Sequence, residues 1–152
     1  MAKKNEAAAL LAGILKAARD KYETDPVLET TKGIDVEVDG VGTFTVLRAH
    51  GRNQNFIKAY RDKVLPYTES AEAKAIKGDD PKLEALNREV FAETVIVGLK
   101  DRDGHAVEYN EDVRAAVIDL LAVTPDLYTL LQSEAVTAAN FLKRPQEVEE
   151  KN

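Results

Sequence analysis

Three helical patterns joined by short polar turns fill residues 80–141, and this stretch most limits what the chain can fold into. In the first pattern, apolar residues recur at steps of three and four, which is the spacing of one face of an α-helix. Asp80 and Pro81 precede it as an N-cap acceptor and a first-turn proline. The pattern predicts a helix whose apolar face carries Leu83, Leu86, Val90, Thr94 and Val97.

Two further helices should follow the polar turn at residues 98–104. Asn110 can cap the first of them, because acidic residues occupy the next two positions and oppose the positive end of the helix dipole. Thr124 and Pro125 repeat the cap-and-proline signal and open a helix that we expect to reach Phe141. The apolar faces that should pack together are Val113, Val117, Leu120 and Leu121, then Leu127, Leu130, Leu131, Ala135, Ala138 and Phe141.

Residues 34–47 change to an alternation of apolar and polar side chains, which is typical of half-buried strands. Asp39 and Gly40 between the two runs suit a hairpin turn. A hairpin of two strands is only marginally stable in water, so its apolar face should pack on the helices or the hairpin should pair with another chain. The second alternative would make the hairpin a site of self-association.

Residues 6–20 form an alanine-rich helical pattern ahead of the hairpin. Alanine is the strongest helix former, so propensity and periodicity agree. Two interpretations stay open: this helix docks on the core, or it docks only on a partner, because the charged stretch 19–25 separates it from the rest. The apolar side of the helix carries Leu10, Leu11, Ile14, Leu15 and Ala18.

The remaining segments complete a prediction of an α+β fold, mostly α, with an N-terminal helix and a β-hairpin followed by a small helical bundle. A polar loop at 50–55 leads to a short helix that we expect Pro66 to end, and residues 68–80 form a charged, partly helical link. The expected division is an N-terminal helix at 1–25, one α+β domain at 26–142 and a flexible acidic tail at 143–152. The short helix should present Phe56, Ala59, Tyr60 and Val64.

Composition narrows the function classes further. The 152 residues contain no cysteine, which excludes disulfides, thiolate metal sites and cysteine catalysis. The apolar run at 7–18 is too short to span a bilayer, so neither a signal peptide nor a membrane partner is expected. A net charge of −6 disfavours nucleic acid as a ligand. A protein or small-molecule partner fits the net charge better, and the absence of cysteine fits a reducing cytosol.

No constellation of catalytic residues emerges from the motifs. His50 and His105 lie beside glycines and match no zinc-binding spacing, and residues 101–104 begin like a calcium loop but lack its later ligands. Glu37 and Asp39 share one strand face, which predicts a solvated surface and not an acid–base pair. A basic region could bind nucleic acid, although the aromatic residues within it fit a buried stripe: Arg48, Arg52, Lys58, Arg61 and Lys63. We therefore predict a non-enzymatic protein without catalytic residues, metal or cofactor.

The order of several segments resembles the tail assembly chaperones of long-tailed bacteriophages. The matching segments are a strand pair with its polar, Asn-containing link into a short helix (44–48 and 53–67), a glycine-containing turn (97–104), a capped leucine-rich helix (109–121) and a last helix before a charged tail (125–141). The resemblance covers residues 34–152 and depends on this order, not on one motif. Leu99 stands where many members have tryptophan, and the helix at 6–20 has no counterpart in the pattern.

The resemblance implies a role in virion morphogenesis in the host cytoplasm. Such a chaperone binds the tape-measure protein, helps to recruit tail-tube subunits and is not retained in the virion. Alternatives are a structural protein of the tail, either tube-associated or a completion subunit, and a small nucleic-acid-binding regulator. We expect the partner-binding residues to lie on the first and last helices, at Leu10, Leu11, Ile14, Leu15, Phe141 and Leu142.

Overall fold

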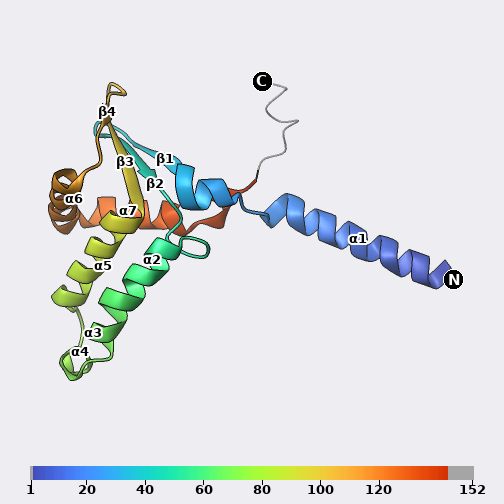
Figure 1. Cartoon of the computed structure of the whole chain (residues 1–152), viewed down its shortest axis with the longest axis horizontal. Coiled ribbons are helices and arrows are strands. Elements are labelled where there is room, and N and C mark those ends of the chain that lie inside the picture. Colours follow the sequence, from blue (N-terminus) through green and yellow to red (C-terminus); the bar gives the residue numbers. More distant parts are fainter. Residues whose placement is uncertain (1, 144–152) are drawn as a thin grey trace.

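The computed structural model describes residues 2–143 and has the predicted mostly helical α+β fold. Helix α1 (Ala2–Tyr22) projects from a body in which helices pack around one end of a small sheet (Figure 1). The expected acidic tail at 143–152 lies outside the described residues except for Lys143. The body therefore begins where α1 ends.

Within residues 2–143 the strands form one antiparallel sheet of four strands in the order β1-β2-β3-β4. Strands β1 (Ile34–Val38) and β2 (Gly42–Val46) confirm the predicted hairpin. Strands β3 (Ile96–Asp101) and β4 (Ala106–Val107) pair with it from the other side. The hairpin is thus extended within the chain, which removes the need for a second molecule to stabilise it.

The prediction that Val97 continues the apolar face of a helix is wrong. Helix α5 (Pro81–Thr94) stops before it, and Val97 lies in β3 with 38% of its surface exposed. The β-branched residues at 95–97 favour a strand, and β2 supplies the neighbour that makes one stable. The β3–β4 hairpin therefore occupies the place where the sequence predicts a simple turn.

Gly42 permits the close approach of β2 to β3. Its backbone has a φ of +149°, and a Cβ at this position would lie 2.2 Å from the carbonyl oxygen of Lys100. Only glycine avoids that collision. The register of the sheet, in which Phe44 lies between Val36 and Leu99, depends on this approach.

The predicted short helix continues past Pro66 instead of ending there. It runs as α2 (Gln54–Ala59), a π-helical turn η2 (Tyr60–Val64) and α3 (Leu65–Thr68). Pro66 lies in the first turn of α3, directly after the π-helical turn, so the change in helix type accommodates the proline without ending the helical run. Helix α4 (Ala71–Ala75) confirms that the following link is partly helical.

The last two helices begin where the sequence predicts, but the prediction that the Thr124 side chain caps α7 is wrong, because its hydroxyl donates to the Leu120 carbonyl oxygen at 2.7 Å instead. Asn110 accepts a hydrogen bond from the Val113 N–H at the start of α6 (Glu111–Val123), and α7 (Pro125–Val136) begins at its proline. Helix α7 ends before the predicted Phe141 because the Asn140 side chain caps the carbonyl oxygen of Glu134 at 2.9 Å. A 3-10 turn, η3 (Ala138–Phe141), carries the chain back toward α1.

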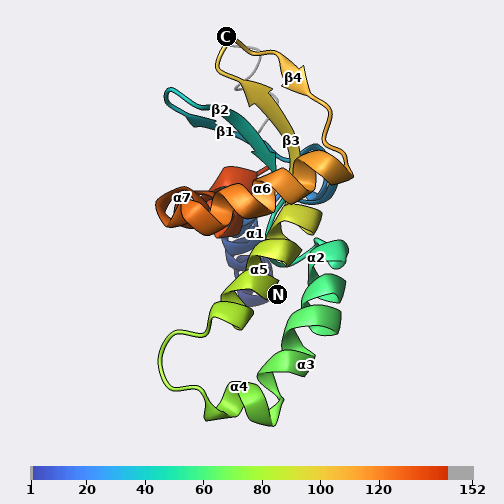
Figure 2. The ribbon, with the colours of Figure 1, turned by 90° about the vertical axis from the view of Figure 1, so that its left-hand side faces the viewer.

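The core lies where the sheet meets α5, α6 and α7, whose crossing Figure 2 shows. Leu120 and Leu130 belong to the predicted apolar faces, but they are 37% and 40% exposed because they lie at the edges of those faces. The residues that form the buried centre are Val36, Phe44, Val46, Ala49, Phe91, Ala92, Val95, Ile96, Val117, Leu121, Leu131 and Ala135.

Candidate partner-binding surface

Local interactions within the described residues stabilise helix α1. Alanines fill much of it, Lys16 pairs with Asp20 one turn later at 2.8 Å, and Arg19 and Lys21 lie in the last turn beside the negative end of the helix dipole. Isolated helices shorter than about 12–15 residues are marginal in water, and α1 exceeds that length with 21 residues. Among the described residues, no part of the body packs against the apolar side of α1.

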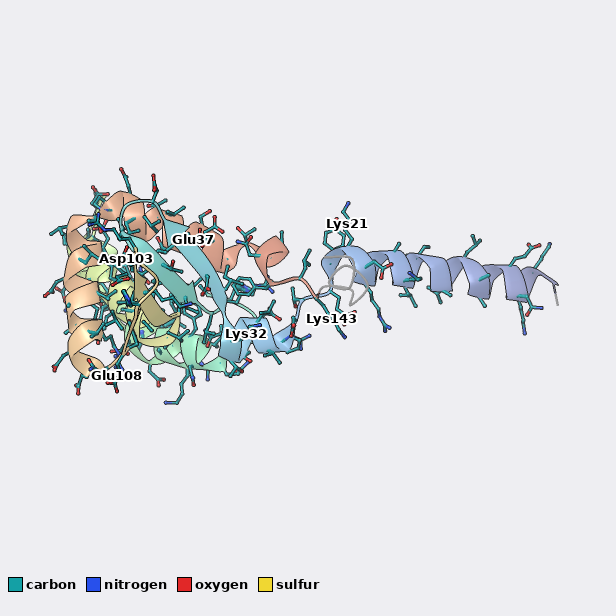
Figure 3. The ribbon with its side chains drawn as sticks, turned by 90° about the horizontal axis from the view of Figure 1, so that it is seen from above. Lys21, Lys32, Glu37, Asp103, Glu108 and Lys143 are labelled. Atoms are coloured by element: carbon teal, nitrogen blue, oxygen red, sulfur yellow. The ribbon has the colours of Figure 1, made fainter. Side chains whose placement is uncertain are left out.

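The four large aliphatic residues of α1 are open to solvent. Leu10 is 71% exposed, Leu11 56%, Ile14 66% and Leu15 51%. Every described side chain of α1 is exposed, and Figure 3 shows them radiating from the helix along its length. Of the two interpretations of the N-terminal helix, docking on the core is therefore wrong for the isolated chain. An apolar face held away from its own core is typical of a docking surface.

A short clasp fixes the base of α1. Thr24 forms an isolated antiparallel bridge with Leu142, the Asp25 N–H donates to the Phe141 carbonyl oxygen at 2.7 Å, and the Lys143 N–H donates to the Glu23 carbonyl oxygen at 2.8 Å. These backbone bonds join the exit of α1 to the end of the chain's last turn. They direct the helix away from the body.

The structure brings together four of the six predicted partner-binding residues, the aliphatic group on α1. Phe141 differs from the expectation, because its side chain is fully buried and anchors the clasp. Leu142 is half-buried beside it in the bridge to Thr24. Phe141 and Leu142 thus belong to the clasp that holds the end of α1. Apolar character alone did not distinguish a buried anchor from an exposed contact.

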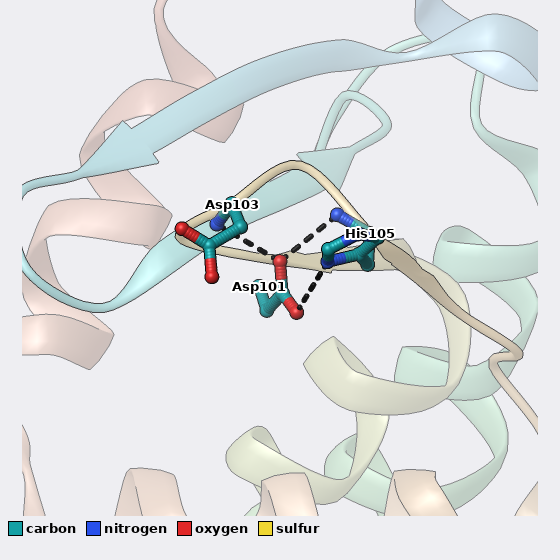
Figure 4. A group of neighbouring side chains, drawn as sticks. All are labelled: Asp101, Asp103 and His105. Carbon is teal, nitrogen blue, oxygen red and sulfur yellow. Dashed lines mark hydrogen bonds and ion pairs between the residues drawn. The ribbon is translucent and has the colours of Figure 1, made fainter.

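A polar cluster lies at the turn between β3 and β4. Ligating atoms of Asp101, Asp103 and His105 lie within 4.8 Å of one another, and all three residues are exposed. Asp101 accepts hydrogen bonds from the N–H groups of Asp103 and His105, both at 2.9 Å (Figure 4). These bonds, the one from His105 above all, lower the pKa of the Asp101 carboxyl. The structural role of the Asp101 carboxylate is therefore to stabilise the β3–β4 turn.

Most of the predicted basic region is neutralised locally. Arg48 and Arg52 both face the buried Glu29, at 2.6 and 3.5 Å. Lys63 contacts Glu89 and Glu93 at 2.9 and 2.8 Å. The positive charge is therefore divided among carboxylates and does not form the continuous basic surface typical of nucleic-acid-binding proteins.

A cleft of about 220 Å³ between α2, η2, α5 and α7 was not expected from the sequence. Phe56 and Tyr60, predicted as a buried stripe, are only half-buried and lie at its edge with ring centroids 6.1 Å apart. The four-residue spacing placed both rings on one face but gave no sign that the neighbouring helices leave that face partly open. The cleft is lined by Ala49, Phe56, Tyr60, Asn87, Val90, Phe91, Tyr128, Gln132 and Val136.

Across residues 2–143, no single helix is both long and apolar enough to cross a membrane; α6 and α7 meet that composition only as a pair, and they bend by 111°. Glu37 and Asp39 are exposed at the hairpin, as the strand alternation predicts. Known protein families, curated proteins and solved structures were compared with this chain, and none matches it significantly.

Proposed function

We propose that this protein is a non-enzymatic assembly chaperone of long-tailed bacteriophages, which uses α1 to hold a helical segment of the tape-measure protein. The exposure of Leu10, Leu11, Ile14 and Leu15 on a helix that does not pack on the body carries the proposal. The order of segments from residue 34 to the charged tail supplies the phage assignment through its resemblance to that family.

A tape-measure protein is long and helical, so outside the tail it exposes apolar stripes that would aggregate. An amphipathic helix can cover such a stripe by laying its apolar face along it. The acidic total of the chain, −6, discourages association between chaperone molecules on the same partner. The complex would stay soluble in the host cytoplasm until tail-tube subunits replace the chaperone, which then leaves the assembling tail.

Co-expression with the long, helix-rich protein encoded beside this chain tests the proposal. We expect the partner to become soluble and to co-purify with the chaperone, which should be absent from purified virions. Leu11→Asp and Leu15→Asp should abolish solubilisation without lowering the melting temperature of the body, because both residues are exposed. Ala9→Asp is the matched control, since residue 9 lies on the opposite side of the helix.

Three results would contradict the proposal. A partner that remains insoluble with the wild-type chain, together with this protein in mature particles, would favour a structural tail protein. Loss of folding in the Leu11→Asp or Leu15→Asp variants would show that α1 packs on the body. If Ala9→Asp lost solubilisation equally, the apolar face of α1 could not be what binds the partner.

A further inference from the structure

Two lysines, Lys4 and Lys21, flank the apolar face of α1 at its two ends. Apolar residues along the middle of that face recur at steps of four, three and four, which is the seam of a coiled coil. Lys4 lies three residues before the seam and Lys21 three residues after it, so both continue its three-and-four spacing and lie on the same side as the aliphatic residues. All six residues are exposed: Lys4, Ala7, Leu11, Ile14, Ala18 and Lys21.

We propose that α1 binds an acidic amphipathic helix, with an apolar seam of two heptads and carboxylates that meet Lys4 and Lys21. This rests on the proposed function, since the acidic helix would be the captured segment of the tape-measure protein. Lys4 and Lys21 are 17 positions apart, about 25 Å along a helix at the standard rise. The partner's carboxylates should have the same separation, with Leu10 and Leu15 covering the flanks of its seam.

Charge complementarity favours this partner over a second α1. The helix contains five basic and two acidic residues, which gives it a net charge of +3. Since the whole chain has a net charge of −6, the residues outside α1 have a net charge of −9. In a parallel pair of α1 helices each seam lysine would face its own copy, and in an antiparallel pair Lys4 would face Lys21. Either arrangement places like charges together at both ends of the seam, which disfavours pairing.

The composition of α1 also favours a protein helix over a lipid surface. Helices that lie in a membrane interface commonly insert Trp or Phe, but α1 has neither, and its one aromatic residue is Tyr22. On a bilayer, the two seam lysines would point toward the acyl chains along with Leu11 and Ile14. A partner helix can instead meet each lysine with a carboxylate at the rim of the contact.

The test uses the full chain and two labelled synthetic helical peptides. Both peptides carry three heptads with leucine along the seam; one has glutamate at the two positions that face Lys4 and Lys21, and the other has lysine there. Fluorescence anisotropy should show that the chain binds the glutamate peptide about tenfold more tightly, as expected for two weak, rim-exposed ion pairs replaced by repulsion. The double variant K4E/K21E should reverse this preference.

The variant K16E/R19E is the matched control, because it changes the net charge equally but on the polar side of α1. It should keep the preference for the glutamate peptide. Equal affinity for both peptides, binding of neither, a dimer of the free chain in light scattering, or tighter binding to anionic phosphatidylserine vesicles than to the glutamate peptide would each overturn the proposal.

The outcome is separable from that of the proposed function. If the tape-measure protein is solubilised equally by the wild type and by K4E/K21E, the chaperone role stands and the acidic-helix inference fails. If the peptide preference reverses as expected but no tape-measure protein is solubilised, α1 recognises acidic helices and the phage role fails.

Discussion

Individual polar residues inside the body join segments that are distant in the sequence. The Asn53 side chain is an example: its oxygen caps α2 by accepting from the Phe56 N–H, and its amide nitrogen donates to the carbonyl oxygens of Arg48 and Thr94 at 2.9 and 3.0 Å. It is 3% exposed, so no water would replace these bonds easily. One side chain thus connects the loop, a helix start and the end of α5.

We expect Asn53→Ala to destabilise the protein by about 3 kcal/mol, since it removes a cap and leaves two carbonyl oxygens short of a partner. Asn110→Ala is the control, because Asn110 is exposed and its side chain caps only α6; it should cost about 1 kcal/mol. Urea denaturation of both variants gives the difference. Equal losses would mean that the two additional bonds of Asn53 contribute nothing.

Tyr109 links the fold to alkaline pH. Burial raises the pKa of its hydroxyl to about 12, and the hydroxyl donates to the Ala92 carbonyl oxygen at 2.6 Å. A tyrosine whose pKa is higher in the folded than in the unfolded state stabilises the fold. This contribution is fully present below the unfolded pKa near 10 and is lost as the pH rises through the folded pKa.

The melting temperature should therefore fall between about pH 10 and 12, and Tyr109→Phe should fall less steeply over that range. Below pH 10 the same variant should be less stable by about 1 kcal/mol, because it lacks the bond to Ala92. Thermal melts followed by circular dichroism across this range measure both effects. An unchanged slope in the variant would contradict the assignment.

At the scale of elements, α1 and the body should melt separately, because every described side chain of α1 is exposed and the clasp joins only its C-terminal end to the body. Gly13 lies in the middle of α1, and a Cβ built there meets no atom within 4 Å. Gly13→Ala should stabilise the helix by about 1 kcal/mol, and Gly13→Pro should break it. Circular dichroism at 222 nm should rise in the first variant and fall in the second, while the melting temperature of the body stays the same. A shift in body melting would show that α1 is coupled to the core.

For the whole molecule, the arrangement predicts the order of proteolysis. Trypsin should first cut at Lys16, Arg19 and Lys21, since a helix without tertiary packing opens locally at low cost. Lys63, held by Glu89 and Glu93 against α5, should be cut much later. Mass spectrometry of timed digests records the order, and addition of the helical partner should protect α1 selectively. Early cleavage at Lys63 would contradict the described packing.

On the acid side of the pH range, the β3–β4 turn should loosen. Because the folded pKa of Asp101 is lowered, its contribution is present above the unfolded value and lost as the pH falls. Asp101→Ala should loosen this turn at neutral pH, which amide hydrogen exchange at residues 103–105 can detect. The same exchange rates in the wild type and the variant would show that the carboxylate does not hold the turn.

The sequence by itself determined the features that depend on neighbours in the chain. The caps at Asp80 and Asn110, the proline that opens α7 and the alternation in β1 all act over a few residues, and the structure has each of them as predicted. The helical character of α1 follows in the same way from its alanines.

Tertiary structure decided what depends on distant partners. The 95–97 segment became a strand because β2 lay alongside it, Phe141 became a buried anchor because the chain returned to the base of α1, and Leu10 to Leu15 stayed exposed because no element of the body reaches them. Periodicity identifies an apolar face, but it does not say what covers that face. That depends on contacts between segments far apart in the chain, and in α1 the described structure leaves the apolar face exposed.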